Sequence, residues 1–209
     1  MRRLVLLRHG RTEWNHTGRA QGHADVPLDE QGEAQARAVV PVLAALDPVA
    51  LWSSDLARAA GTAAFVATEA RLEPRLDPRL REYDVGPNRQ GLTREQYAVA
   101  HPAEHAALAA GVVGSIPGRE SASDVMGRML PALTSYADML ADGETGIVVS
   151  HGAALRTCVP AFLGWPDEID QTLGVLANCG WAELEQAAPT WTPATVRWRL
   201  RAWNRVVPS

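Results

Sequence analysis

Two histidines stand at the ends of short apolar runs that are far apart along the chain. His9 follows the run at residues 4–7, His151 follows the run at 146–150, and a glycine comes after each histidine. Short apolar runs are typical of buried parallel strands, which carry ligand-binding groups at their carboxyl ends. If the two strands are neighbours, both imidazoles meet at one sheet edge. With the guanidinium of Arg8 they would offer a nucleophile and a cation to an anion.

The segments between and after these strands must position further groups. The predicted elements are helices at 31–46, 56–66, 93–110 and 121–140, and strands at 48–54, 175–184 and 195–203. Pro41 predicts a kink or break in the first helix, and His101-Pro102 predicts a break in the third. We expect Ser54 or Asp55 to cap the second helix. This alternation predicts an α/β fold, and the length of 209 residues predicts one domain over residues 1–209.

Composition excludes several classes of function. A net charge of -4 gives no general attraction to nucleic acid or anionic membranes, so any anion site must be local. The arginines of the last strand, Arg197, Arg199 and Arg201, are expected on the solvated side of an edge strand. No signal-peptide core or membrane span is apparent, and Cys158 and Cys179 lack a paired spacing. The sequence predicts a cytoplasmic protein with reduced cysteines and leaves a homodimer open.

Arg58 falls in the first turn of the second helix, where the helix dipole disfavours a cation. A phosphate bound beside the exposed N–H groups would compensate for this cost, and a solvent-facing arginine is the alternative. The polar loop at 15–28 is long enough to fold over the sheet edge, and its Asn15, Gln21 and Gly22 are candidate ligand contacts. His101 and His105 are four residues apart, but Pro102 lies between them and no third ligand is near, so no metal site is expected.

Five short motifs, in this order along the chain, resemble those of the histidine phosphatase superfamily, the phosphoglycerate mutase-like proteins. They are Arg8-His9-Gly10 with Thr12 and Asn15, Ser53-Ser54-Asp55-Leu56 with Arg58, Leu80-Arg81-Glu82, Pro117-Gly118 with Glu120-Ser121, and Ser150-His151-Gly152. The tail is most similar to actinobacterial phosphatases of the glucosyl-3-phosphoglycerate phosphatase type. The resemblance implies a three-layer α/β/α sandwich around a mostly parallel sheet with an antiparallel edge strand.

The chemistry of the residues agrees with a metal-independent phosphoric monoester hydrolase that needs no cofactor. His9 is expected to attack phosphorus and become a phosphohistidine. Arg8, Arg58 and a protonated His151 would offset the charge on the phosphoryl oxygens. By resemblance, Glu82 is the acid that protonates the leaving oxygen and later accepts a proton from water.

Further contacts to a small phosphorylated substrate are expected from position and resemblance. The backbone N–H of Gly152 or Ala153 is one such candidate. Where many relatives have a Gly-x-Trp-Glu-Gly turn after the acid, this chain places Arg89, which either contacts a second anionic group or is solvated. Arg119, at the Pro117-Gly118 turn, likewise either contacts a second anionic group or is solvated.

A phosphatase is the preferred interpretation. A phosphoglycerate mutase-type phosphoryl transfer is the nearest alternative, but the stretch between Glu82 and Pro117 lacks the longer insertion of the mutases. A non-catalytic protein that binds a phosphorylated ligand is the third hypothesis. A complete set of nucleophile, acid and cations argues against mere binding.

Overall fold

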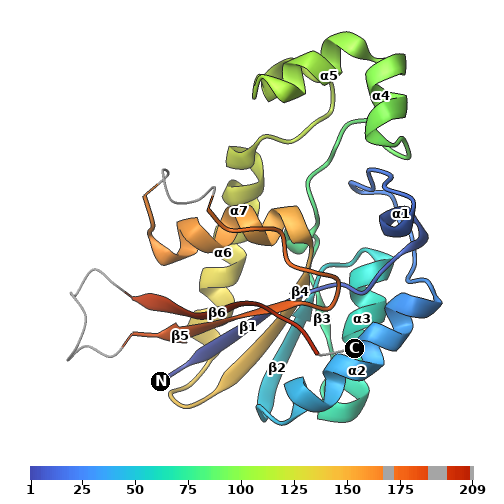
Figure 1. The fold of residues 1–209 in the computed structure, drawn as a ribbon. Coiled ribbons are helices and arrows are strands. Elements are labelled where there is room, and N and C mark those ends of the chain that lie inside the picture. Colours follow the sequence, from blue (N-terminus) through green and yellow to red (C-terminus); the bar gives the residue numbers. More distant parts are fainter. Residues whose placement is uncertain (167–171, 188–196, 208–209) are drawn as a thin grey trace.

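The computed structural model describes residues 1–166, 172–187 and 197–207, which form a six-stranded sheet with helices on both faces (Figure 1). The strands are β1 (Arg3–Arg8), β2 (Pro48–Ser53), β3 (Arg75–Leu76), β4 (Thr145–Ser150), β5 (Trp181–Gln186) and β6 (Trp198–Arg205). Their spatial order is β3-β2-β4-β1-β5-β6. The first four strands are parallel, and β5 and β6 add antiparallel pairs at one edge. The predicted fold class is confirmed.

Helices α2 (Glu30–Ala44) and α3 (Ala57–Ala70) cover one face of the sheet, and α6 (Ala122–Met139) and α7 (Gly152–Leu163) cover the other. The position of β1 in the middle of the sheet explains why its residues 4–7 are all apolar. Leu4 and Leu6 pack into the core under α6 and α7, whereas Val5 and Leu7 pack into the core under α2 and α3. A strand covered on both faces has no polar side to alternate with.

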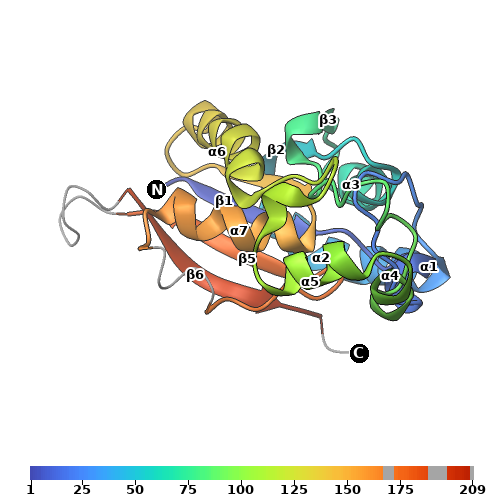
Figure 2. The ribbon, with the colours of Figure 1, turned by 90° about the horizontal axis from the view of Figure 1, so that it is seen from above.

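Three short helices lie at the carboxyl end of the parallel strands, above the sheet in Figure 1. They are α1 (Glu13–His16), α4 (Arg94–Ala100) and α5 (Pro102–Ala109). Seen from above in Figure 2, α4 and α5 extend over this end of the molecule. Two single-turn 3₁₀ helices, Pro78–Leu80 and Val113–Ser115, occupy the connecting loops. The predicted break at His101-Pro102 is confirmed.

The structure differs from two sequence predictions for the helices. Of the predicted kink or break at Pro41, the break is absent, because α2 continues past Pro41 to Ala44. Neither Ser54 nor Asp55 caps α3, which begins after Leu56 without a side-chain cap. Instead, the N–H of Ala57 donates to a carboxylate oxygen of Asp25 in the first loop, 2.6 Å away. A remote loop therefore supplies the acceptor that a local cap normally provides.

The C-terminal strands differ from the prediction at their start. Residues 175–180 are a loop that ends in a turn and not the beginning of β5, and Cys179 in this turn adopts a left-handed conformation (φ 52°). The start of the last predicted strand, 195–196, lies outside the described residues. Arg199 and Arg201 on β6 pair with Glu185 of β5, so these edge arginines are ion-paired and not only solvated. No helix in the described part of the chain is long and apolar enough to cross a membrane.

Candidate active site

The two histidines meet at the carboxyl ends of β1 and β4. These strands are parallel neighbours with Arg8 opposite Ser150, and the N–H of His9 donates to the carbonyl of Ser150 at 3.0 Å. The imidazole centroids are 5.1 Å apart. His9 is 3% exposed and His151 is fully buried. The juxtaposition that the sequence predicts across most of the chain is therefore present.

His9 is held in the tautomer and charge state of a nucleophile. Its Nδ1 lies 2.7 Å from the carbonyl oxygen of Gly10, an acceptor, so Nδ1 carries the proton and Nε2 keeps its lone pair. Burial, and then the charges of Arg58 and Arg8, lower the pKa of His9 well below its usual value. Gly10 itself allows close packing, since a Cβ there would lie 2.5 Å from the carbonyl oxygen of Gly32.

Arg58 is buried beside His9, which rules out the solvent-facing alternative. Its two terminal nitrogens donate to the carbonyls of Ala24 and Gly22, each at 2.8 Å, and only 1% of the residue is exposed. Burial is the main cause that lowers the pKa of Arg58 to about 10, a value that leaves it protonated at neutral pH. Gly22 thus positions Arg58 through its carbonyl.

Arg8 approaches the same histidine from the end of β1. One terminal nitrogen donates to the carbonyl of Leu176 at 2.6 Å. The Nε atoms of both Arg8 and Arg58 are buried and have no hydrogen-bond partner. Gly152 makes room for Val175 and Arg8, because a Cβ at that position would lie 2.6 Å from Val175 Cγ1 and 3.2 Å from Arg8 Nε. Two buried guanidinium N–H groups therefore remain available for an anion.

His151 contacts the site from its buried side. Its Nε2 lies 2.8 Å from the hydroxyl of Ser54, and its Nδ1 is buried without a partner. Burial, and then the charges of Arg58, His9 and Arg8, lower the pKa of His151 well below its usual value. With these neighbours alone His151 is neutral. The expected protonated form would need a bound anion, which raises the pKa of a nearby imidazole.

Glu82 lies across the first turn of α7. Its carboxylate accepts hydrogen bonds from the N–H groups of Tyr83 (3.0 Å), Ala153 (3.1 Å) and Ala154 (2.8 Å). The predicted phosphate contact from the Ala153 N–H is therefore taken by Glu82 in this arrangement. The positive end of the α7 dipole stabilises this carboxylate.

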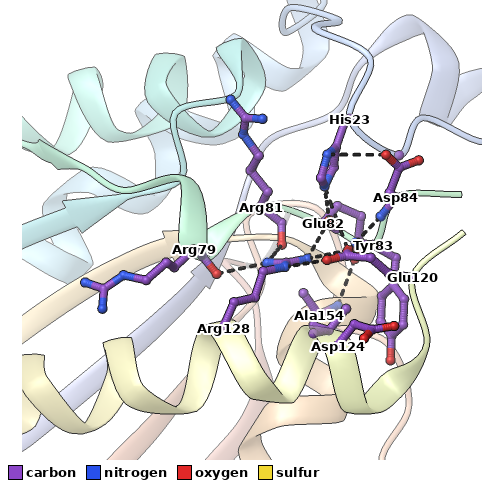
Figure 3. A network of polar contacts seen from close by, with 12 residues as sticks. His23, Arg79, Arg81, Glu82, Tyr83, Asp84, Glu120, Asp124, Arg128 and Ala154 are labelled. Carbon is purple, nitrogen blue, oxygen red and sulfur yellow. Dashed lines mark hydrogen bonds and ion pairs between the residues drawn. The ribbon is translucent and has the colours of Figure 1, made fainter. Parts of the chain in front are cut away.

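Arg128 of α6 fixes the backbone of the loop that carries Glu82 (Figure 3). Its guanidinium donates to the carbonyls of Arg79 (2.9 Å), Arg81 (2.7 Å) and Glu82 (2.9 Å). Two further bonds of 2.8 Å go to the carboxylate of Glu120. All five donors of the guanidinium point into one network, so the loop is held from below by a single side chain.

His23 holds the same loop from the opposite side, as Figure 3 shows. Its Nε2 donates to the carbonyl of Glu82 at 2.7 Å, and its Nδ1 lies 3.6 Å from the carboxylate of Asp84. The carbonyl of Glu82 thus accepts from both His23 and Arg128. The first loop of the chain and α6 together determine where the acid lies.

A cavity of about 680 Å³ opens over His9. Among the predicted site residues it is lined by Arg8, His9, Asn15, Gln21, Gly22, Arg58, Glu82, Arg89 and Ala153. The side-chain oxygens of Asn15 and Gln21 both lie within hydrogen-bond distance of the Thr12 hydroxyl, which leaves their amide N–H groups available to a ligand. His151 and Gly152 are not part of this lining.

Sequence reasoning missed several supporting residues. Thr62 accepts from the N–H of Gly10 and donates to the carbonyl of Arg58, so it links both parts of the site. Asn178 donates to the carbonyl of His9 at 3.1 Å. A buried polar residue on a helix face was the available signal for Thr62, but no local pattern identifies its partner.

The described residues contain no cluster of three or more His, Cys, Asp or Glu side chains that could hold a metal ion. His101 and His105 instead pack around the ring of Tyr97, with centroid distances of 5.7 and 6.2 Å. Both cysteines are buried and free, as expected.

Comparison with known proteins identifies the family. The pattern of the histidine phosphatase superfamily (branch 1) matches residues 4–199. This chain belongs to the histidine phosphatase superfamily. It is 35% identical over 214 residues to the glucosyl-3-phosphoglycerate phosphatase of Mycolicibacterium vanbaalenii, covering 98% of this chain and 95% of the relative. A probable phosphoglycerate mutase GpmB of Serratia proteamaculans is 34% identical over 191 residues, covering 91% and 88%.

Solved structures agree with this histidine phosphatase fold. A mycobacterial glucosyl-3-phosphoglycerate phosphatase complexed with VO3 superposes with a TM-score of 0.84 at 35% identity, covering 98% of this chain and 99% of that chain. A structure described as mycobacterial hydrolase 1 gives a TM-score of 0.87 at 34% identity, covering 99% and 100%. These relatives confirm the predicted class, a phosphoric monoester hydrolase of the histidine phosphatase family.

Proposed function

We propose that this histidine phosphatase hydrolyses small phosphomonoesters through a phosphohistidine on His9, with Arg8, Arg58, Glu82 and His151 as the other reacting groups. One observation carries this assignment: the free Nε2 of His9 lies in the same site as the buried guanidinium N–H groups of Arg8 and Arg58, which have no hydrogen-bond partner. A buried donor without an acceptor costs about 1–3 kcal/mol. A phosphoryl group bound beside His9 would satisfy those donors.

The first step transfers the phosphoryl group to the protein. The Nε2 lone pair of His9 attacks phosphorus, and the bond from phosphorus to the leaving oxygen breaks. Glu82, in its acid form, gives that oxygen a proton. Arg8 and Arg58 stabilise the charge on the three remaining oxygens. The dianion also favours protonation of His151, which then adds a third cation.

The second step regenerates the enzyme. Glu82, now a carboxylate, accepts a proton from a water molecule that attacks the phosphohistidine. The bond between phosphorus and Nε2 breaks, its electrons return to the imidazole, and inorganic phosphate leaves. Asn15 and Gln21 contribute amide N–H groups that orient the phosphoryl oxygens.

The substrate class follows from the cavity and from the relatives. Similar proteins carry the name glucosyl-3-phosphoglycerate phosphatase, which makes that phosphomonoester the first metabolite to test. A cavity of about 680 Å³ is large enough for a metabolite of this size. Cytoplasmic location and a homodimer stay predictions.

The test is phosphate release from p-nitrophenyl phosphate and from glucosyl-3-phosphoglycerate, with His9→Asn as the variant. The proposal expects hydrolysis by the parent and a loss of at least about 10³-fold in the variant, because a covalent step has no substitute nucleophile. Unchanged hydrolysis by His9→Asn would overturn the mechanism. Isomerisation of a phosphoglycerate without net phosphate release would support the mutase alternative instead.

A further inference from the structure

A second pair of arginines lines the same cavity as His9. Arg89 lies on the loop after Glu82, and Arg119 lies on the turn before α6. The mechanism above uses neither side chain. Burial, and then the charge of Arg119, lower the pKa of Arg89, whereas Arg8 is the cation that acts on Arg58. Besides Arg8 and Arg58, the cavity lining holds the cations Arg89 and Arg119, together with Arg19 and Arg156.

Local backbone geometry brings the two arginines together. Residues Val85 and Arg119 form an antiparallel bridge, and the N–H of Glu120 donates to the carbonyl of Asp84 at 3.0 Å. Gly86 (φ 80°) makes this approach feasible, because a Cβ there would lie 2.6 Å from the carbonyl oxygen of Pro117. The loop that carries Arg89 therefore lies against the turn that carries Arg119, in a backbone conformation that favours glycine at position 86.

Two of the three guanidinium nitrogens of Arg119 are unpartnered within the described residues. Its Nε and one terminal nitrogen are buried without any hydrogen bond. The neighbouring carboxylate of Glu120 is engaged by both nitrogens of the Arg128 fork. A buried charged donor without an acceptor is unfavourable by several kcal/mol unless a ligand supplies one.

Arg89 is similarly free at its charged end. It lies over the ring of Tyr97 at 5.8 Å, and within the described part of the chain no carboxylate or carbonyl accepts a hydrogen bond from its side chain. The carboxylate of Glu104, beside the Tyr97 ring, accepts from the Tyr97 hydroxyl (2.8 Å) and from the amide of Asn88 (2.7 Å). The ring stack orients Arg89 without neutralising it.

We propose that Arg89 and Arg119 form a subsite for a second oxyanion, a carboxylate or a second phosphate, on the substrate. This inference rests on the proposed function and narrows its substrate class to phosphomonoesters that carry another negative group. Two guanidinium forks match the geometry of either oxyanion. The subsite would bind the far end of the substrate while His9 attacks the phosphoryl end.

The experiment uses phosphonates, which occupy a phosphate site without being hydrolysed. Dissociation constants are measured by calorimetry for ω-phosphonoalkanoic acids of increasing chain length and for the alkylphosphonates of the same lengths. A second series carries a phosphonate at both ends. We expect the terminal anion to tighten binding by about tenfold or more at one chain length, since one charge-assisted hydrogen bond contributes roughly 1.5–3 kcal/mol.

Variants then assign the gain to the two side chains. For each pair, the dissociation constant of the alkylphosphonate is divided by that of the ligand with the second anion. In Arg89→Gln and in Arg119→Gln, this ratio is expected to fall below about threefold. The control Arg37→Gln removes one exposed positive charge on α2 and should leave the ratio unchanged. If the carboxylate series shows the larger gain in affinity, the subsite prefers a carboxylate; if the bisphosphonate series does, it prefers a second phosphate.

Two results would overturn the subsite: no chain length at which the terminal anion tightens binding to the parent protein, or a gain that survives both substitutions. Calorimetry needs no turnover, so this outcome is independent of the proposed function. A protein that shows the gain but releases no phosphate would refute hydrolysis and keep the subsite.

Discussion

Replacing Arg128 with methionine tests whether one side chain positions the acid loop. The substitution keeps the aliphatic volume and removes all five hydrogen bonds of the guanidinium. It leaves the Glu120 carboxylate, which is 20% exposed, without its cation. Breaking a buried ion pair by removing one partner costs about 3–5 kcal/mol. Because water reaches this pair in part, we expect the lower end, about 3 kcal/mol.

The loss is measured by urea unfolding followed by circular dichroism, and by thermal unfolding. For a protein of this size, about 3 kcal/mol corresponds to a fall in Tm of roughly 6–12 °C. The control Arg37→Met removes an exposed ion pair with Glu33 and should cost under about 0.5 kcal/mol.

Activity separates positioning from stability. The carbonyl of Glu82 loses one of its two donors, and a shift of about 1 Å at a catalytic group costs up to about 10²-fold in rate. We expect kcat to fall by about 10- to 100-fold at a temperature where the variant is folded. The Kd of inorganic phosphate should stay within about twofold, since Arg8 and Arg58 are untouched. An unfolding free energy within about 1 kcal/mol of the parent and an unchanged kcat would refute this reasoning.

Three further predictions follow from the geometry. In histidine ¹⁵N NMR spectra, His9 should remain a neutral ring at neutral pH and titrate below the ordinary range of a histidine, because burial and the charges of Arg58 and Arg8 lower its pKa; a midpoint near pH 6.5 would contradict this. Gly152→Ala should weaken phosphate binding by about tenfold, roughly one charge-assisted hydrogen bond, since the added Cβ would lie 2.6 Å from Val175 Cγ1 and 3.2 Å from Arg8 Nε; calorimetry with inorganic phosphate measures it, and an unchanged Kd argues against crowding. Burial opposes ionisation of Asp77, but hydrogen bonds from an arginine and a tyrosine outweigh it and lower its pKa to about 2. The pKa of Asp77 is lower in the folded than in the unfolded protein, so its ionised form stabilises the fold above about pH 4, and this stabilisation is lost toward pH 2. Asp77→Asn should therefore lower the free energy of unfolding at pH 7 and make it less dependent on pH below about pH 4. An unchanged urea midpoint at pH 7 would contradict this prediction.

The sequence alone predicts the parts of the site that lie in short, local patterns. Apolar runs that end in histidine identify β1 and β4, and parallel pairing then brings His9 and His151 together. The cation in the first turn of α3 identifies Arg58, which is unfavourable for the helix unless something else holds it. These signals are local, and for Arg58 burial in the folded chain decides between a site residue and a solvent-facing one.

Contacts between remote segments are not predictable in the same way. The acceptor at the N-terminus of α3 is Asp25, about thirty positions earlier, and no residue pattern near Ser54 predicts this contact. The network of Arg128 joins α6 to the loop of Glu82 through backbone carbonyls, which have no sequence signature. The charge state of His151 also depends on burial and on neighbours that only the folded chain assembles.

The most direct test of the mechanism is to trap the covalent intermediate. The protein is mixed with a ³²P-labelled phosphomonoester, quenched in alkali within milliseconds, and digested, and the labelled peptide is identified by mass spectrometry. We expect the label on the peptide that contains His9, in a linkage that is stable in alkali and lost in acid. We expect no label in His9→Asn. Full turnover by the parent with no labelled protein at any time point, or label on another residue, would contradict the mechanism.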